Sequence, residues 1–386
     1  MKTISLSFTT KKHGYTIFIG EHLLENIVEY IPLDNYSNFF IITDTNVAPL
    51  FLPRLLQGLP KNTKHIAIAP GEKEKSITTL QHLWQALIDA KCDRKTLVIN
   101  LGGGVIGDMG GFAASTYLRG VDFINIPTTL LAQVDESVGG KTMINFGGIK
   151  NNIGTFTQPR GVIIDLTTLK TLPKREFLSG FAEIIKYGII SDVIYFKYVT
   201  KKHPLKFTTR ELEKIIAGSC AIKKSIVQED EQEITGHRKL VNYGHTIGHA
   251  IESLSLETST PLLHGEAISI GMVAEARLAE KCGLLSKEAV STIEQAFVMA
   301  DLPITIPKQL QLARGVKSIS IGRTTTDIDY SPVKGITIET LLDKMRYDKK
   351  NEKGIINFTL PTDIGKAEIN QQPTEKEILE ILLTIL

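Results

Sequence analysis

Short apolar runs recur along the first half of the chain, separated by segments with helical spacing. The runs are NFFIITD from residue 38, KHIAIAPGE from 64, KTLVINLGGG from 95, VDFINIPTT from 121 and GVIIDL from 161. They are β-branched and nearly continuous, which is typical of strands buried on both faces of a parallel sheet. Strands that alternate with helices in this way predict a doubly wound, Rossmann-like α/β domain.

The apolar pattern changes after Leu172. The later segments carry apolar residues at helical spacing, as in FAEIIKYGII, RELEKIIAGSCAIKKSIV, HTIGHAIESL and GEAISIGMVAEARLAEKCG. We therefore predict two domains, an α/β domain over residues 1–172 and a mainly α-helical domain over residues 173–386, which begins at a proline. Polar clusters between residues 308 and 338 are typical of a surface insertion.

Composition and charge narrow the class of protein. A length of 386 residues and a hydrophobic content of 42% suffice for two cores, and a net charge of +2 does not favour nucleic acid as a partner. The three cysteines lie far apart without a CxxC pair, which is typical of a reducing compartment. The sequence shows neither a signal-peptide pattern nor a membrane-length apolar run, so we expect a soluble, cytoplasmic protein.

A glycine-rich turn follows the third apolar run. Residues Gly102–Asp108 come after the strand-like TLVIN and lead into the helical segment MGGFAAST. Glycines let the backbone approach a pyrophosphate, and a helix N-terminus offers N–H donors to it. The turn predicts a dinucleotide site, although helix packing alone also selects such glycines.

Other strand ends place polar residues at the same expected edge of the sheet. Asp44 is suited either to accept hydrogen bonds from a ribose or to cap the next helix. The charged segment Gly71–Lys75, taken by itself, is typical of a solvated surface. Thr128 and Thr129 follow the fourth run, at the edge where ligands bind in such sheets.

The helical half contains a concentration of histidines. His245 and His249 are four residues apart and share a helix face, and His264 follows in the next segment. Glu183 adds a carboxylate on an otherwise apolar helix. One carboxylate with imidazoles suits a divalent ion such as zinc. Spacing alone nominates His245 and His249 as a ligand pair, in the manner of HExxH, and leaves the ligand set open.

Basic side chains able to clamp phosphate and carboxylate groups are scattered along the chain. They are Arg119, Lys141, Lys150, Lys186, Lys223, Arg238, Lys349 and Lys350, with Asn151 beside Lys150. Taken singly, each is typical of a surface charge. The sequence shows no Ser-His-Asp or Cys-His motif, so acyl-enzyme chemistry has no support.

Six motifs together resemble those of the 3-dehydroquinate synthase family, in the family's order. They are LGGGVIGDMGGFAAS, YLRGVDFINIPTTLLAQVDESVGGKT, GFAEIIKYG, LVNYGHTIGHAIE, LLHGEAISIGM and MRYDKKNEKG. The resemblance covers residues 15 to 368. It implies that Glu183, His245 and His264 bind zinc or cobalt and that His249 contacts the substrate.

The resemblance also implies contacts with NAD and with the substrate. The implied NAD contacts are Asp44, Gly71, Glu72, Lys73, Glu74, Lys75, Gly104, Val105, Ile106, Gly107, Asp108, Thr128, Thr129, Lys141, Lys150, Thr168, Leu169, Lys170 and Thr171. The implied substrate contacts are Asp135, Lys141, Lys150, Asn151, Lys186, Lys223, Arg238, Asn242, His249 and Lys349. Arg119 matches an arginine that the family lends to the neighbouring subunit, which implies a homodimer.

The implied reaction converts 3-deoxy-D-arabino-heptulosonate 7-phosphate to 3-dehydroquinate and phosphate, the second step of the shikimate pathway. It proceeds by transient oxidation with NAD, phosphate elimination, reduction, ring opening and aldol closure. The chain departs from the family pattern in places. Glu136 stands where serine is common, Phe146–Ile149 replaces His-Pro-x-Gly, and one extra residue before Arg238 leaves either Lys223 or Lys224 as the family's lysine.

Three alternatives share features with this interpretation. A related cyclase for sedoheptulose 7-phosphate would keep NAD, metal and fold, but Arg238 and Asn242 match positions that the synthases use near the substrate carboxylate. A polyol dehydrogenase of the same architecture would not need so many phosphate-binding lysines. A non-catalytic relative would be expected to lack at least one of Glu183, His245 and His264.

Overall fold

The computed structural model describes residues 4–8, 14–147, 149–311, 335–346 and 355–386. Contacts divide the chain into two compact units, residues 1–184 with 204–238, and residues 185–203 with 239–386. The predicted boundary at residues 172 and 173 lies directly before helix α4 (Lys174–Ser191), whereas the division by contacts falls inside that helix. The domain limits 1–172 and 173–386 stay a prediction.

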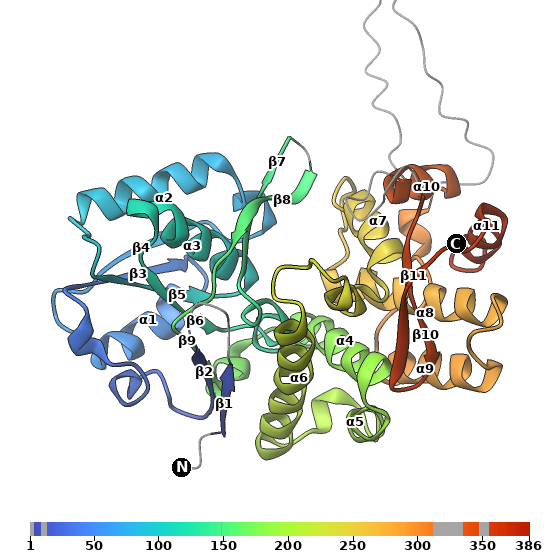
Figure 1. Ribbon diagram of the computed structural model, residues 1–386, viewed down its shortest axis with the longest axis horizontal. Helices are drawn as coiled ribbons and strands as arrows, with labels where there is room; N and C mark the ends of the chain where they lie inside the picture. Colours follow the sequence, from blue (N-terminus) through green and yellow to red (C-terminus); the bar gives the residue numbers. More distant parts are fainter. Residues whose placement is uncertain (1–3, 9–13, 148, 312–334, 347–354) are drawn as a thin grey trace, which may run out of the picture. The chain divides into compact units, whose positions relative to one another are not determined.

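A seven-stranded sheet forms the centre of the first unit (Figure 1), with the strand order β1-β2-β9-β6-β5-β3-β4. Its strands are β1 (Ile4–Phe8), β2 (Tyr15–Gly20), β3 (Asn38–Asp44), β4 (Lys64–Ile68), β5 (Thr96–Gly102), β6 (Asp122–Pro127) and β9 (Gly161–Asp165). All neighbours pair in parallel except β1 and β2. The five strands predicted from apolar runs, and the Rossmann-like class, are confirmed; β1 and β2 were not predicted.

Helices cover the two faces of this sheet and bury alternate strand residues. On one face, Phe39 and Ile41 pack in a cluster with α1 (Ala48–Gln57). On the other, Phe40 and Ile42 pack with α2 (Ile77–Asp89) and α3 (Gly104–Thr116). Because both faces are covered, β3 and β5 are buried along almost their whole length, as the continuous apolar runs require.

Two further elements complete the first unit. An antiparallel hairpin of β7 (Lys141–Phe146) and β8 (Ile149–Phe156) lies outside the main sheet and was not predicted. Helix α6 (Thr209–Glu229) begins with a capping box at Thr208 and Glu211. A short π-helix, Ala132–Glu136, follows β6 and contacts α6.

The second unit is mainly helical, as predicted. Besides the end of α4 it contains α5 (Val193–Val199), α7 (His245–Ser255), α8 (His264–Lys281), α9 (Lys287–Met299), α10 (Ile338–Arg346) and α11 (Glu375–Leu382), with a two-stranded sheet of β10 (Phe358–Asp363) and β11 (Lys366–Gln371). Most of the predicted insertion, residues 312–334, lies outside the described residues. Of the helices that the structure describes, none has the length and hydropathy to cross a membrane.

Candidate active site

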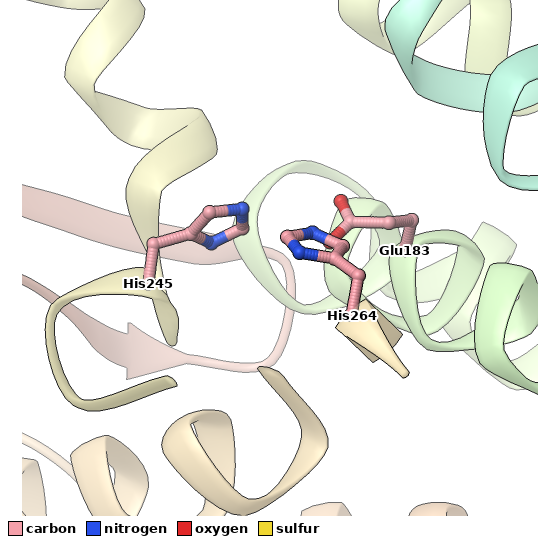
Figure 2. Close-up of side chains that lie close together, drawn as sticks. All are labelled: Glu183, His245 and His264. Carbon is pink, nitrogen blue, oxygen red and sulfur yellow. The ribbon is translucent and has the colours of Figure 1, made fainter. Parts of the chain in front are cut away.

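One carboxylate and two imidazoles lie close together near helix α4. Glu183 comes from α4, and His245 and His264 are the first residues of α7 and α8. One potential ligand atom of each lies within 4.8 Å of those of the other two, and Figure 2 shows the three groups pointing toward one another. Glu183 is fully buried, a costly environment for a carboxylate without a cationic partner. A carboxylate and two imidazoles suit zinc or cobalt, with room for substrate oxygens.

The two imidazoles are oriented by hydrogen bonds at Nδ1. The Nδ1 atom of His245 lies 3.0 Å from the carbonyl oxygen of Tyr243. That of His264 lies 3.4 Å from a carboxylate oxygen of Glu252. Because a carbonyl or carboxylate only accepts, each Nδ1 carries the hydrogen, and Nε2 remains available as a metal ligand.

His249 lies in the same cluster of rings but in a different ligand group. Its ring centroid is 4.9 Å from that of His245 and 5.9 Å from that of His264. Among the described residues, two groups are arranged to hold an ion, Glu183 with His245 and His264, and His249 with Glu252 and His264. His245 and His249 do not occur together in either group, so the geometry does not favour the HExxH-like pairing suggested by their spacing. His264 is the common member.

The glycine-rich turn follows strand β5 and is hydrogen-bonded to the residue that follows the neighbouring strand β6. Gly103 is the N-cap of α3, and the backbone N–H of Thr128 donates to the carbonyl of Gly102 at 3.0 Å. A Cβ on Gly104 would lie 1.5 Å from a carboxylate oxygen of Glu136. The turn therefore needs glycine here for close approach, and it brings the predicted residues of β5 and β6 together at the carboxyl edge of the sheet.

The Asp44 carboxylate stabilises the turn that directly precedes helix α1. One of its carboxylate oxygens accepts from the backbone N–H groups of Asn46 and Val47, at 2.9 and 3.0 Å, directly before α1. The N-cap of α1 is Val47, without a side-chain cap hydrogen bond, so the interpretation of Asp44 as the helix N-cap is wrong. A contact of Asp44 with a ribose stays a prediction. Farther along the sheet, Thr168 donates to the carbonyl of Asp165 at 2.7 Å, in a 3-10 helix that follows β9.

Lys75 corrects the interpretation of Gly71–Lys75 as a wholly solvated segment. Its side chain is 4% exposed, and its ammonium lies 2.8 Å from the carboxylate of Asp108 on α3. Burial alone would lower the pKa of Lys75, but Asp108 and Glu72 together raise it above its ordinary value. Lys150 lies 3.8 Å from Glu72. The segment is therefore tied to the glycine-rich turn by a buried ion pair, which local sequence does not reveal.

A second charged group gathers near the start of β7. Lys223 lies 2.5 Å from Asp135 and is buried, which favours it over Lys224 as the lysine of this group. Lys141 forms an ion pair with Glu233. The buried guanidinium of Arg238 donates to the carbonyl oxygens of Gly139 and Glu231, at 3.0 and 2.8 Å.

The remaining predicted residues occupy varied surroundings. Lys186 is buried on α4, with its ammonium 5.1 Å from the Tyr187 ring centroid. Asn242 lines a small pocket of about 20 Å³, beside Thr246 and Phe358. Arg119 is exposed and has φ of +68°, directly after Leu118 at +49°. Lys349 lies outside the described residues.

Three residues of this region were missed by sequence reasoning: Tyr243, Glu252 and Glu275. The last two are buried acids on helices that are otherwise largely apolar. The same signal singled out Glu183, so it was available in the sequence.

The chain matches family models over most of its length. The model described as 3-dehydroquinate synthase N-terminal matches residues 65–179, and the one described as 3-dehydroquinate synthase C-terminal matches residues 180–351. A 3-dehydroquinate synthase of Desulforamulus reducens is 40% identical over 377 residues, which are 96% of each chain. One of Legionella pneumophila is 41% identical over 348 residues, 89% of this chain and 86% of the relative.

Solved structures share the fold at lower identity. A 2-deoxy-scyllo-inosose synthase complexed with carbaglucose-6-phosphate, NAD+ and Co2+ superposes with a TM-score of 0.83 at 24% identity, covering 99% of this chain and all of that one. A 2-epi-5-epi-valiolone synthase from Streptomyces hygroscopicus, with NAD+ and Zn2+ bound, has a TM-score of 0.80 at 25% identity, covering 100% and 99%. A glycerol dehydrogenase from Schizosaccharomyces pombe reaches 0.62 at 15% identity, covering 100% and 90%.

Proposed function

Because the chain belongs to the 3-dehydroquinate synthase family, it is an enzyme of the shikimate pathway, and we propose the sites with which it works. Its substrate is 3-deoxy-D-arabino-heptulosonate 7-phosphate, which is closed to 3-dehydroquinate with loss of phosphate. The observation that carries the proposal is the convergence of Glu183, His245 and His264 in a chain about 40% identical to such synthases over nearly its full length.

The metal site consists of Glu183, His245 and His264, and takes zinc or cobalt. When bound, the ion supplies Lewis acidity to adjacent substrate hydroxyls. The carbonyl of Tyr243 and the carboxylate of Glu252 hold the imidazoles so that each offers Nε2. We infer that His249 contacts the substrate, and the position of its ring beside both His245 and His264 supports this role.

The NAD site lies along the carboxyl edge of the parallel sheet. NAD supplies a reversible acceptor of hydride, with no net consumption. The glycine-rich turn and the start of α3 offer backbone N–H groups to the pyrophosphate, and Lys75 with Asp108 holds the neighbouring segment against that turn. The other residues of this site are Asp44, Thr128, Thr129 and Thr168–Thr171, all at strand ends.

The substrate phosphate and carboxylate are bound by basic groups. Lys141, Lys223 and Arg238 form one charged group whose acids, Asp135 and Glu233, keep it ordered. Such a concentration suits a substrate with two anionic groups and is not needed for an uncharged polyol. Lys150, Asn151, Lys186, Asn242 and Lys349 complete the proposed substrate contacts.

We also propose a cytoplasmic homodimer in which Arg119 reaches the neighbouring subunit's site. Leu118 and Arg119 both have left-handed backbone angles, each of which costs on the order of 1–3 kcal/mol in a residue with a side chain. Strain of this kind concentrates at functional sites, and it supports a specific presentation of the exposed Arg119.

The decisive experiment supplies the purified protein with NAD, zinc or cobalt, and the heptulosonate phosphate. We expect equal amounts of phosphate and 3-dehydroquinate, with no net NADH in the absorbance of the reduced cofactor. Accumulating NADH would indicate a dehydrogenase instead. Sedoheptulose 7-phosphate is assayed as the comparison substrate. Faster turnover of this compound than of the heptulosonate phosphate would indicate a related cyclase.

The lowered pKa of the Lys141 side chain leads us to predict how the reaction rate depends on pH. Burial lowers the pKa of Lys141 to about 8, and the nearby Arg238 lowers it as well, although Glu233 opposes them. The ammonium that binds phosphate is therefore lost from the free enzyme as the pH rises through about 8. We expect kcat/KM to fall about tenfold per pH unit on this alkaline limb, since kcat/KM reports the free enzyme.

The variant Lys141→Arg provides the control, because a guanidinium stays protonated over the whole range. Its kcat/KM is expected to lose the alkaline limb, even if the value at pH 7 is lower. An unchanged limb in this variant would assign the titration to another group.

A further inference from the structure

Backbone N–H groups at the start of helix α7 donate hydrogen bonds to a buried carboxylate of helix α8. Glu275 is fully buried, and its oxygens accept three backbone N–H groups. One oxygen accepts from Gly244 at 2.6 Å, and the other from Thr246 at 3.1 Å and Ile247 at 3.2 Å. These donors flank His245, the first residue of α7.

This arrangement requires the two helices to approach closely. Gly244 has φ of +79°, and a Cβ there would lie 2.2 Å from the Met272 side chain. A Cβ on Gly271 would lie 2.1 Å from the carbonyl oxygen of Gly244 and 2.6 Å from the nitrogen of Gly248. Glycines at these positions let α7 lie against α8, so that the Glu275 side chain reaches the backbone of α7.

A second restraint acts on the same segment. The hydroxyl of the fully buried Tyr243 donates to the carbonyl of Met272 at 2.7 Å, while the carbonyl of Tyr243 accepts from Nδ1 of His245. Both the backbone and the ring of His245 are therefore fixed through α8. A carboxylate is the strongest acceptor available for N–H groups at a helix N-terminus, because it is charged and the N–H dipoles point toward it.

We propose that Glu275 is a positioning residue for the metal site, which holds the first turn of α7 so that Nε2 of His245 meets Glu183 and His264. The inference rests on the proposed metal site and deepens it. Glu275 does not contact the ion. It acts through the backbone of Gly244, Thr246 and Ile247, so its loss moves one ligand of three.

The test compares Glu275→Gln with the wild-type chain. Glutamine has nearly the same shape, but one of its two terminal atoms donates, so at least one backbone N–H of α7 loses its acceptor. We expect the dissociation constants for zinc and cobalt to rise about 10- to 100-fold, the usual effect of removing an outer partner of a ligand. The visible absorption spectrum of bound cobalt should change as well, since it reports the geometry of the ligands.

Glu294→Gln is the matched control. Glu294, on α9, pairs with Arg277 of α8 at 2.7 Å, so this variant weakens α8 packing without contacting α7. Its metal affinity and cobalt spectrum are expected to equal those of the wild type. Glu275→Asp, which keeps the charge but shortens the side chain by one methylene, should shift both readouts in the same direction as Glu275→Gln.

The outcomes separate the two levels of the proposal. If the wild-type chain binds metal tightly and Glu275→Gln binds it equally, with an unchanged cobalt spectrum, the positioning role is wrong while the metal site stands. If the wild type binds neither metal, the metal site is wrong and the role of Glu275 falls with it. If neither Glu275 variant folds, the residue serves folding in general, and the inference is overturned.

Discussion

Glu183→Gln is expected to deprive the enzyme of its metal and of nearly all activity. Glutamine keeps the shape of the side chain but removes the negative charge that offsets the divalent ion in a fully buried position. Lewis acidity contributes several kcal/mol to catalysis of this kind, so turnover should fall by about 10³-fold or more. Two quantities are measured: metal content by elemental analysis, and NAD affinity by fluorescence titration. Metal content should fall strongly, whereas NAD affinity should change little.

Glu176→Gln provides the control on the same helix. Glu176 lies in the first turn of α4, two turns before Glu183, and belongs to neither ligand group that the described residues form. This variant is expected to retain metal and activity. A Glu183→Gln protein that kept its metal but lost NAD would show that the ligands have been misplaced.

The sequence was informative where burial leaves a local pattern. The five predicted strands lie inside the sheet or at its β4 edge, and most are covered on both faces, so each carries a run of apolar residues. The hairpin of β7 and β8 was missed because β8 has no buried residue among its eight. Strand β2 alternates between buried and half-buried positions, which gives a weaker signal over only six residues.

The site was less predictable, because its geometry depends on contacts between distant segments. Helical spacing relates His245 to His249, whereas His264 reaches the same cluster only through the packing of α7 against α8. The family resemblance supplied the ligand set that spacing left open. Lys75 shows the same limitation, since the burial of its ammonium is explained by Asp108, 33 residues later in the chain.

Asp108→Asn is expected to destabilise the first unit more than any other single change to its charged groups. The variant leaves the ammonium of Lys75 buried at 4% exposure without its nearest carboxylate. Removing one partner of a buried ion pair typically costs about 3–5 kcal/mol in the free energy of unfolding. Trp84 reports this region, because it is the only tryptophan and its indole on α2 donates to Thr116 on α3 at 3.1 Å. Denaturant unfolding followed by its fluorescence measures the loss.

Two further variants show whether the uncompensated charge is the cause. Lys75→Met combined with Asp108→Leu removes both charges, and stability should return to within about 1–2 kcal/mol of the wild type, since apolar side chains often replace buried pairs at little cost. Glu375→Gln breaks the exposed pair with Arg346 at 2.9 Å and should change stability by less than about 1 kcal/mol. If the double variant were as unstable as Asp108→Asn, lost packing and not the buried ammonium would explain the effect. NAD affinity should fall in both Asp108 variants, because the proposed cofactor site depends on the same link between Lys75 and the glycine-rich turn.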